Sequence, residues 1–196
     1  IHWFQQLWPV IIPSVKSSLA LTNVQIGTLT AVRQFASGPL LTLPSGLMAD
    51  MFRRRTSIIL ALAFIAFGIS HFLVAQSATY GWIIPGVALL GVGTALWHPA
   101  SMGTLSRHFP ERRGSVLAIH GVGASIGDTV APIAIGFLLL TLSWQRLLEA
   151  HMIPAILVAL LLWKGLGSFY KTHEELGTRP SLDSYWNDLK NLMKSQ

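Results

Sequence analysis

The chain has 196 residues, of which 52% are hydrophobic and only 11% are charged. Ordinary soluble domains contain about 25% charged residues, so this composition excludes most water-soluble globular folds and indicates a membrane protein. The sequence has no cysteine, which excludes a disulfide framework and a cysteine-ligated metal site. The net charge of +6 could indicate a nucleic-acid-binding protein, but the basic residues stand between apolar stretches rather than on one polar face. We therefore expect no nucleic-acid partner, no metal and no cofactor.

Long apolar stretches, separated by short polar loops, predict six membrane-spanning helices. They extend over His2 to Val15, Val24 to Ala49, Ser57 to Gln76, Gly81 to Leu105, Ser115 to Leu142 and Leu148 to Leu166. The first apolar stretch begins at the first residues of the sequence, so we expect the N-terminus to be truncated. Short loops require successive spans to pack antiparallel, which predicts an all-α bundle over residues 1–166.

The basic residues predict how this bundle is oriented. Eleven of the fourteen lysines and arginines lie in the second loop, in the fourth loop or after the last span. Cytoplasmic loops of membrane proteins carry such an excess, so we expect both ends of the chain in the cytoplasm and the bundle in the bacterial plasma membrane.

The composition turns polar over residues 167–196. Beyond Pro180, apolar residues recur at helical spacing, which predicts an amphipathic helix at the start of a cytoplasmic linker. Such a helix could lie on anionic headgroups or dock on a partner domain.

The second loop carries the most specific motif of the chain. It reads Gly46-Leu-Met-Ala-Asp50-Met-Phe-Arg53-Arg54-Arg55. This pattern resembles the major facilitator superfamily signature between spans two and three, in which a glycine and an aspartate precede a basic cluster. The matching residues are Gly46, Asp50, Arg54 and Arg55, whereas Met51 and Arg53 differ from the signature. The resemblance implies a conformational latch rather than a substrate site.

Three further stretches are similar to the fosmidomycin-resistance-like efflux branch of that superfamily. They are Gly91-Val-Gly93-Thr-Ala-Leu-Trp97-His98-Pro99, Pro110-Glu-Arg112-Arg113-Gly114-Ser and Ser143-Trp144-Gln-Arg146. The resemblance implies the N-terminal six-helix half of a twelve-helix fold, built from two inverted three-helix repeats, with a C-terminal half as its partner. It also implies a secondary transporter that exports a small organic molecule by alternating access, driven by protons.

The fifth predicted span contains small residues and a proline at Gly123, Gly127, Pro132 and Gly136. This pattern is similar to the glycine-proline motif of drug:proton antiporters. Glycines allow two helices to approach closely, and a proline frees a carbonyl so that the helix can bend. The same residues would also serve helix packing with no role in transport.

Arg33 in the second span and Asp128 in the fifth are the charged residues that stand out. A charge inside a bilayer costs about 2.5–3.5 kcal/mol on insertion scales, so a functional reason is the first hypothesis. The helical rise places both at similar depths. We expect them to face a central cavity and to pair with each other or to bind an ionisable substrate, with Asp128 as the proton carrier. The alternative is a static pair that stabilises the bundle.

Weaker candidates for the substrate and proton pathway are uncharged or titrate near neutral pH. They are Gln5, Gln6, Gln34, Trp97, His98 and His120. His98 and His120 could form a titrating pair near neutral pH, or each could simply hydrogen-bond to a neighbouring helix.

Other functions remain open at this point. The chain could be an uptake facilitator for a small metabolite or anion, or a six-span half-transporter that dimerises. An intramembrane serine protease is the least favoured, because Gly123-Ala-Ser125-Ile-Gly127 lacks the glycine that follows the serine in rhomboid-type enzymes, so we expect no enzymatic activity.

Overall fold

The computed structural model describes residues 1–167, 187, 190 and 191. Within these residues the chain is helical and contains no strand, which confirms the predicted all-α class. The predicted amphipathic helix beyond Pro180, and with it most of the predicted linker, lies outside the described residues.

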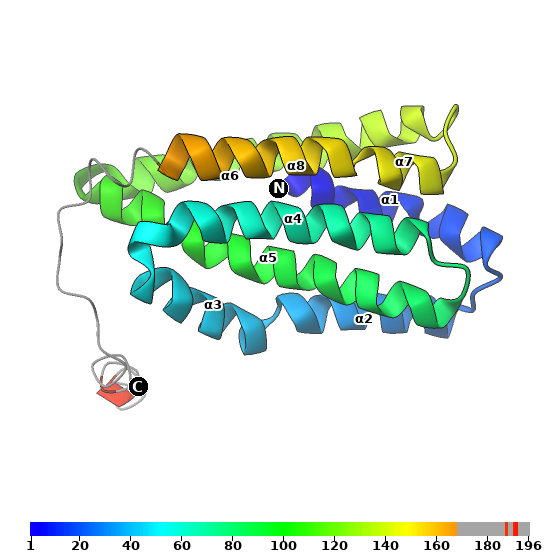
Figure 1. The fold of residues 1–196 in the computed structure, drawn as a ribbon, viewed down its shortest axis with the longest axis horizontal. Coiled ribbons are helices and arrows are strands. Elements are labelled where there is room, and N and C mark those ends of the chain that lie inside the picture. The colour runs from blue at the N-terminus through cyan, green and yellow to red at the C-terminus, as the bar shows by residue number, and fades with distance from the viewer. Residues whose placement is uncertain (168–186, 188–189, 192–196) are drawn as a thin grey trace.

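The helices lie alongside one another as an elongated bundle (Figure 1). They are α1 (His2–Ser18), α2 (Asn23–Ser37), α3 (Pro39–Met51), α4 (Thr56–Ala75), α5 (Tyr80–His108), α6 (Arg113–Leu138), α7 (Trp144–Ala150) and α8 (Met152–Leu161). Two 3₁₀ turns, η1 (Arg53–Arg55) and η2 (Pro110–Arg112), connect long helices at one end of the bundle. A π-helical segment, η3 (Leu162–Leu166), extends α8 toward that same end.

Among the described residues, four helical segments are long and apolar enough to cross a membrane, against six that the sequence predicts. They are Arg53–Ala75, Tyr80–His108, Pro110–Leu138 and Trp144–Leu166. The predicted first span corresponds to α1, which has 17 residues, and the predicted second span is divided into α2 and α3 with 15 and 13 residues. A membrane bundle is therefore supported, while the count of six spans remains a prediction.

The division between α2 and α3 has a local cause at Gly38. A proline ring disfavours helical backbone in the residue before it, and Gly38 is extended, with φ −80° and ψ −173°. Pro39 then occupies the first turn of α3, where its missing N–H has no intrahelical partner to lose.

The core lies around α4, which packs against α5 on one side and α7 and α8 on the other. Buried alanines and aromatic rings fill these contacts, and the Ser70 hydroxyl donates to the Gly86 carbonyl at 2.7 Å. In the most apolar stretch of α4 67% of the residues are buried, whereas in that of α6 only 11% are. One long face of α6 is therefore open.

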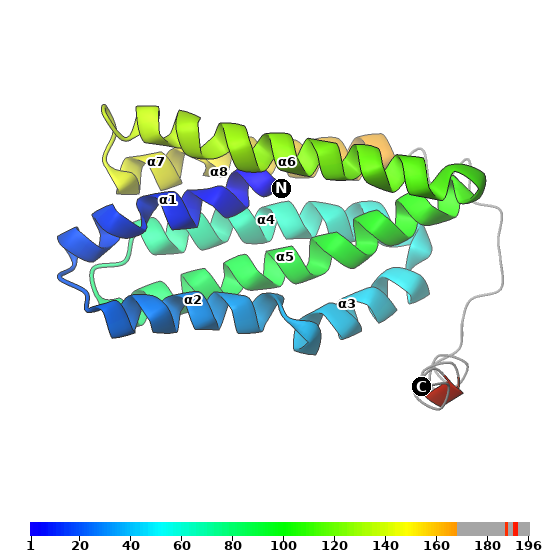
Figure 2. The same cartoon turned by 180° about the vertical axis from the view of Figure 1, so that it is seen from behind.

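Helix α1 lies along only part of the bundle, from its middle to the end that carries the α4–α5 connection (Figure 2). It packs mainly on α6. Near its start, the Trp3 indole N–H donates to Nε2 of His151 at 2.9 Å, while Nδ1 of His151 lies 2.7 Å from the Leu147 carbonyl. These two bonds require the proton of a neutral His151 ring to be on Nδ1.

Candidate functional site

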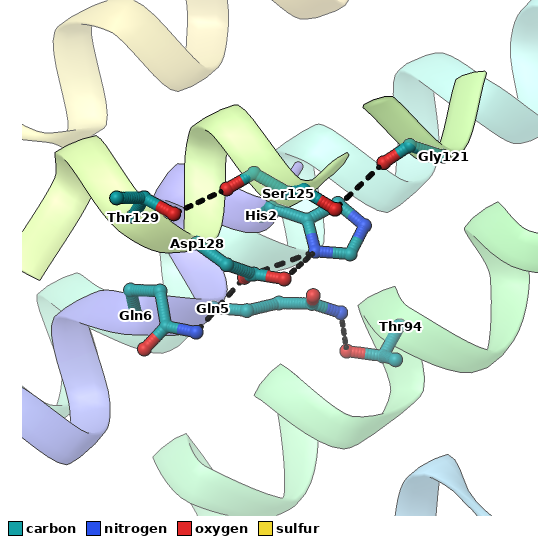
Figure 3. Close-up of polar contacts among 8 residues, drawn as sticks. All are labelled: His2, Gln5, Gln6, Thr94, Gly121, Ser125, Asp128 and Thr129. Carbon is teal, nitrogen blue, oxygen red and sulfur yellow. Dashed lines mark hydrogen bonds and ion pairs between the residues drawn. The ribbon is translucent and has the colours of Figure 1, made fainter. Parts of the chain in front are cut away.

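A polar cluster joins the first turns of α1 to the middle of α6 (Figure 3). Nδ1 of His2 lies 3.1 Å from both carboxylate oxygens of Asp128, and the Gln6 side-chain amide donates to one of these oxygens at 2.9 Å. Residues 2 and 6 are four apart, so a helix places both on the face that meets α6. The side chain of His2 is 20% exposed and that of Asp128 is 42% exposed, so the cluster is open on one side.

The cluster continues from α1 toward α5. The buried Gln5 amide donates to the Thr94 hydroxyl at 3.0 Å, and this hydroxyl donates in turn to the Leu90 carbonyl at 3.0 Å. The ring of His98 stands edge-on to that of His2, with 6.0 Å between centroids. His120 on α6 is half-buried. Three helices therefore contribute polar side chains to one region.

The close approach of α1 to α6 depends on Gly127. A Cβ atom built there would lie 3.0 Å from the Cβ of His2, so a side chain at this position would push His2 away from Asp128. Gly123 and Gly136 have no atom of another element within 4 Å of such a Cβ. The predicted packing role is thus visible at Gly127, while for Gly123, Gly136 and the half-buried Pro132 it remains a prediction.

Arg33 and Asp128 are not brought together. Asp128 bonds to His2 and Gln6, while the half-buried Arg33 on α2 makes no hydrogen bond or ion pair with any residue that the structure describes. Gln34 beside it is exposed. Trp97 packs edge-on against Phe64 of α4 with 5.3 Å between centroids, which places its ring in the core contact between α4 and α5.

Two members of the cluster were missed by the sequence analysis. His2 lies four residues before Gln6, and this spacing was a signal that the two side chains share one face of a helix. No sequence pattern points to Thr94, because serine and threonine are common in membrane helices and their hydroxyls usually donate hydrogen bonds to carbonyls of the same helix.

The latch motif forms a second polar contact at the end of the bundle where α3 meets α5. The Asp50 carboxylate accepts a hydrogen bond from the Arg107 guanidinium at 3.0 Å. Gly46 lies against the ring of Pro99, where a Cβ atom would make an ordinary contact of 3.6 Å. The aspartate thus pairs with an arginine of α5 rather than with Arg54 or Arg55, which are exposed.

The chemistry available in the polar cluster is hydrogen bonding and proton exchange. A carboxylate, an imidazole and two amides can bind a polar molecule or accept a proton. The described residues contain no group of three or more side chains placed to hold a metal ion.

Comparison with known proteins agrees with the motifs. The family model described as Major Facilitator Superfamily matches residues 4–192. The fosmidomycin resistance protein of Escherichia coli is 30% identical over 129 residues, which cover 66% of this chain and 31% of that protein. The lincomycin resistance protein LmrB of Listeria monocytogenes is 29% identical over 121 residues, or 61% of this chain and 25% of that protein. The peptide transporter YePEPT of Yersinia enterocolitica is 30% identical over 156 residues, which cover 76% of this chain and 29% of that protein.

The matched part of the chain thus spans less than a third of the length of each of these relatives. The resemblance predicted from the second loop is confirmed, and so is the similarity to the fosmidomycin-resistance branch. Members of this family move small molecules across membranes and are transporters rather than enzymes. The chain belongs to the Major Facilitator Superfamily.

Proposed function

We propose that the protein is a secondary transporter that exports a small organic molecule in exchange for protons. The observation that carries this proposal is the contact of His2 and Gln6 on α1 with Asp128 on α6, which is half-exposed and lies within helices of a transporter family. Relatives whose names record resistance to fosmidomycin and to lincomycin favour export over uptake.

The geometry of the His2–Asp128 pair supports a proton step. A protonated imidazole and an ionised carboxylate attract each other across 3.1 Å, and this attraction draws α1 toward α6. A proton that neutralises Asp128 removes the charge from the acceptor, and the contact then weakens. In this scheme the proton load of one carboxylate alters how tightly two helices pack, which couples protonation to alternating access.

The contact between Asp50 and Arg107 supports the latch role. It ties the end of α3 to the end of α5 at the side where the arginine-rich turns lie, and it would break when those helices separate. We place this end in the cytoplasm, because the positive-inside rule assigns the arginine-rich loops to that side. The end of η3 then lies on the cytoplasmic side, whereas α1 begins in the middle of the bundle, and the membrane is the plasma membrane.

The open face of α6 supports a second six-helix unit as a partner. Apolar side chains that are 49–71% exposed follow one another at helical spacing along this face. They are Ile119, Val122, Ile126, Val130, Ile133 and Phe137. We propose that this stripe packs against the other half of a twelve-helix transporter, in which the bent α2–α3 pair forms one of six spans and α1, which runs from the middle of the bundle to one end, belongs to another. The alternative occupant is a second copy of this chain.

Proton coupling is tested in inside-out vesicles from cells that express the protein from its native reading frame. The vesicles are acidified by respiration, and a pH-sensitive acridine dye follows proton release on addition of fosmidomycin or lincomycin. We expect drug-dependent release for the wild type and none for Asp128→Asn. Glu149→Gln is the matched control, because it neutralises the acid that accepts a hydrogen bond from Gln76, far from the cluster.

Each outcome of the vesicle experiment decides between the candidates. Drug transport that Asp128→Asn retains at the wild-type rate would refute the proton role of this residue. If the drug accumulates in right-side-out vesicles and not in inside-out vesicles, the protein imports the drug, and the proposal of export is wrong. If Glu149→Gln abolishes drug-dependent proton release as completely as Asp128→Asn, the loss reflects misfolding or the removal of any acidic side chain. It would then not show a specific role of the polar cluster.

The partner of α6 is tested by disulfide cross-linking of this 196-residue chain, which has no cysteine of its own. Ile126→Cys places a single thiol on the open face of α6, and Leu62→Cys places one at a similarly exposed position of α4. Efficient Ile126→Cys homodimers, with none for Leu62→Cys, indicate a dimeric half-transporter. Absence of Ile126→Cys dimers favours a different six-helix partner.

A further inference from the structure

The junction of η1, the first turn of α4 and η3 is an unusual region outside the polar cluster. Helix α4 and η3 pack together here, and a Cβ atom at Gly167 would lie 3.6 Å from the Ser57 hydroxyl. Leu162 and Leu166 of η3 contribute to the packing against the buried group around Ile59 and Leu60. The segment that follows α8 is thereby fixed beside the arginines that precede α4.

Positive charge at this junction has no described counter-charge. Arg54, Arg55 and Lys164 are exposed, and none forms an ion pair with a carboxylate in the part of the chain that the structure describes. Arg53 is half-buried, and its Nε has no hydrogen-bond partner among those residues. Asp50, which the motif would offer to these arginines, is held by Arg107.

Apolar side chains that point away from the bundle adjoin this charge. On α4 they are Ile58 and Leu62, which are 40% and 52% exposed. At the end of α8 and in η3 they are Leu161 and Trp163, which are 71% and 51% exposed. Tryptophan favours the boundary between headgroups and acyl chains. The π-helical geometry of η3 is itself uncommon and occurs often at functional sites.

We propose that this junction binds an anionic phospholipid, with Arg54, Arg55 and Lys164 on the phosphodiester headgroup and the acyl chains along Ile58, Leu62, Leu161 and Trp163. Charge complementarity selects the occupant: guanidinium groups bind phosphate oxygens through paired hydrogen bonds, and the adjoining apolar surface matches an acyl chain rather than a soluble anion. This binding is independent of the transported substrate and of which membrane face the junction occupies.

The test is native mass spectrometry of the delipidated full chain with equal amounts of phosphatidylglycerol and phosphatidylcholine. Each basic side chain near a phosphate surface contributes about fivefold in affinity. We therefore expect Arg54→Gln/Arg55→Gln to lower the preference for phosphatidylglycerol at least about tenfold. The matched control is Arg112→Gln/Arg113→Gln, which removes the same charge at the α5–α6 turn and is expected to leave the preference within about twofold.

Three results would overturn the proposal. Equal losses in the two double variants would show a diffuse charge effect rather than a site. A wild-type protein with no preference between the two lipids would exclude anionic headgroup recognition. Displacement of bound phosphatidylglycerol by millimolar inorganic phosphate would show that the junction is a site for a soluble anion. Leu62→Gln, which keeps the arginines and makes the acyl surface polar, is expected to weaken binding of both lipids.

Discussion

Gly91 of α5 lies against the backbone of α2, and its replacement gives the sharpest test of the fold. A Cβ atom at Gly91 would lie 2.5 Å from the Arg33 carbonyl oxygen, about 0.9 Å inside the 3.4 Å at which ordinary contact begins. It would also lie 2.6 Å from the Cβ of Ala36. Two of the nearest atoms belong to the α2 backbone, so relief requires a shift of the helix rather than of a flexible side chain.

The magnitude follows from a comparison with Gly123. Replacing a helical glycine by alanine gains about 1 kcal/mol of intrinsic helix stability at either position, whereas overpacking destabilises by about 1–3 kcal/mol. A Cβ atom at Gly123 meets nothing within 4 Å. The propensity gain cancels in the comparison, so Gly91→Ala should unfold at a temperature lower than Gly123→Ala by at least about 2 °C.

The assay is thermal unfolding in detergent followed by intrinsic fluorescence, for which the chain supplies seven tryptophans. Gly91→Leu and Gly123→Leu repeat the comparison with a larger side chain and should widen the gap. Equal unfolding temperatures within both pairs would refute the close approach of α2 to α5 at Gly91. A specific loss of transport in Gly91→Ala without thermal change would likewise contradict the packing argument.

Three further changes test named contacts. Ser70→Ala removes the buried bond to the Gly86 carbonyl and should lower the free energy of unfolding by about 0.5–1.5 kcal/mol, measured by thermal shift, with exposed Ser125→Ala as a neutral control. Trp3→Phe removes the donor to His151, and a double-mutant cycle with His151→Leu should give a coupling of about 0.5–1.5 kcal/mol; zero coupling would exclude the bond. Asp50→Asn weakens the pair with Arg107 and should reduce transport, while the exchange Asp50→Arg/Arg107→Asp should restore part of it; no recovery argues for a role of Asp50 beyond the pair.

Hydropathy predicts the long central helices closely. The predicted spans from Ser57 to Gln76 and from Gly81 to Leu105 correspond to α4 and α5, because both are continuous and end at polar residues. The span predicted over Val24 to Ala49 misses the break at Gly38, because hydropathy does not take account of the effect of Pro39 on the residue before it. Helix α6 ends at Leu138, four residues before the predicted end, because the mostly apolar residues from Leu139 to Leu142 form a turn rather than helix.

The partners of the candidate site residues are not predictable from the sequence. Helical rise predicts comparable depths for Arg33 and Asp128, but it does not say toward which neighbour either side chain points. The partner of Asp128 is His2, because Gly127 allows α1 to lie against α6 at that level. Asp50 belongs to the predicted latch motif, whereas its partner Arg107 lies 57 residues away and no local pattern connects them.

The extended backbone at Gly38 gives this half of the bundle a mechanical joint. No single helical hydrogen-bond ladder runs through both α2 and α3, although both helices pack along α5. A continuous rod would transmit a tilt at Asp50 along its whole length and would strain the close contact at Gly91. With the joint in place, a tilt of α3 about Gly38 would not have to move α2 on α5, so a change at one end of the bundle would not have to disturb the packing at the other.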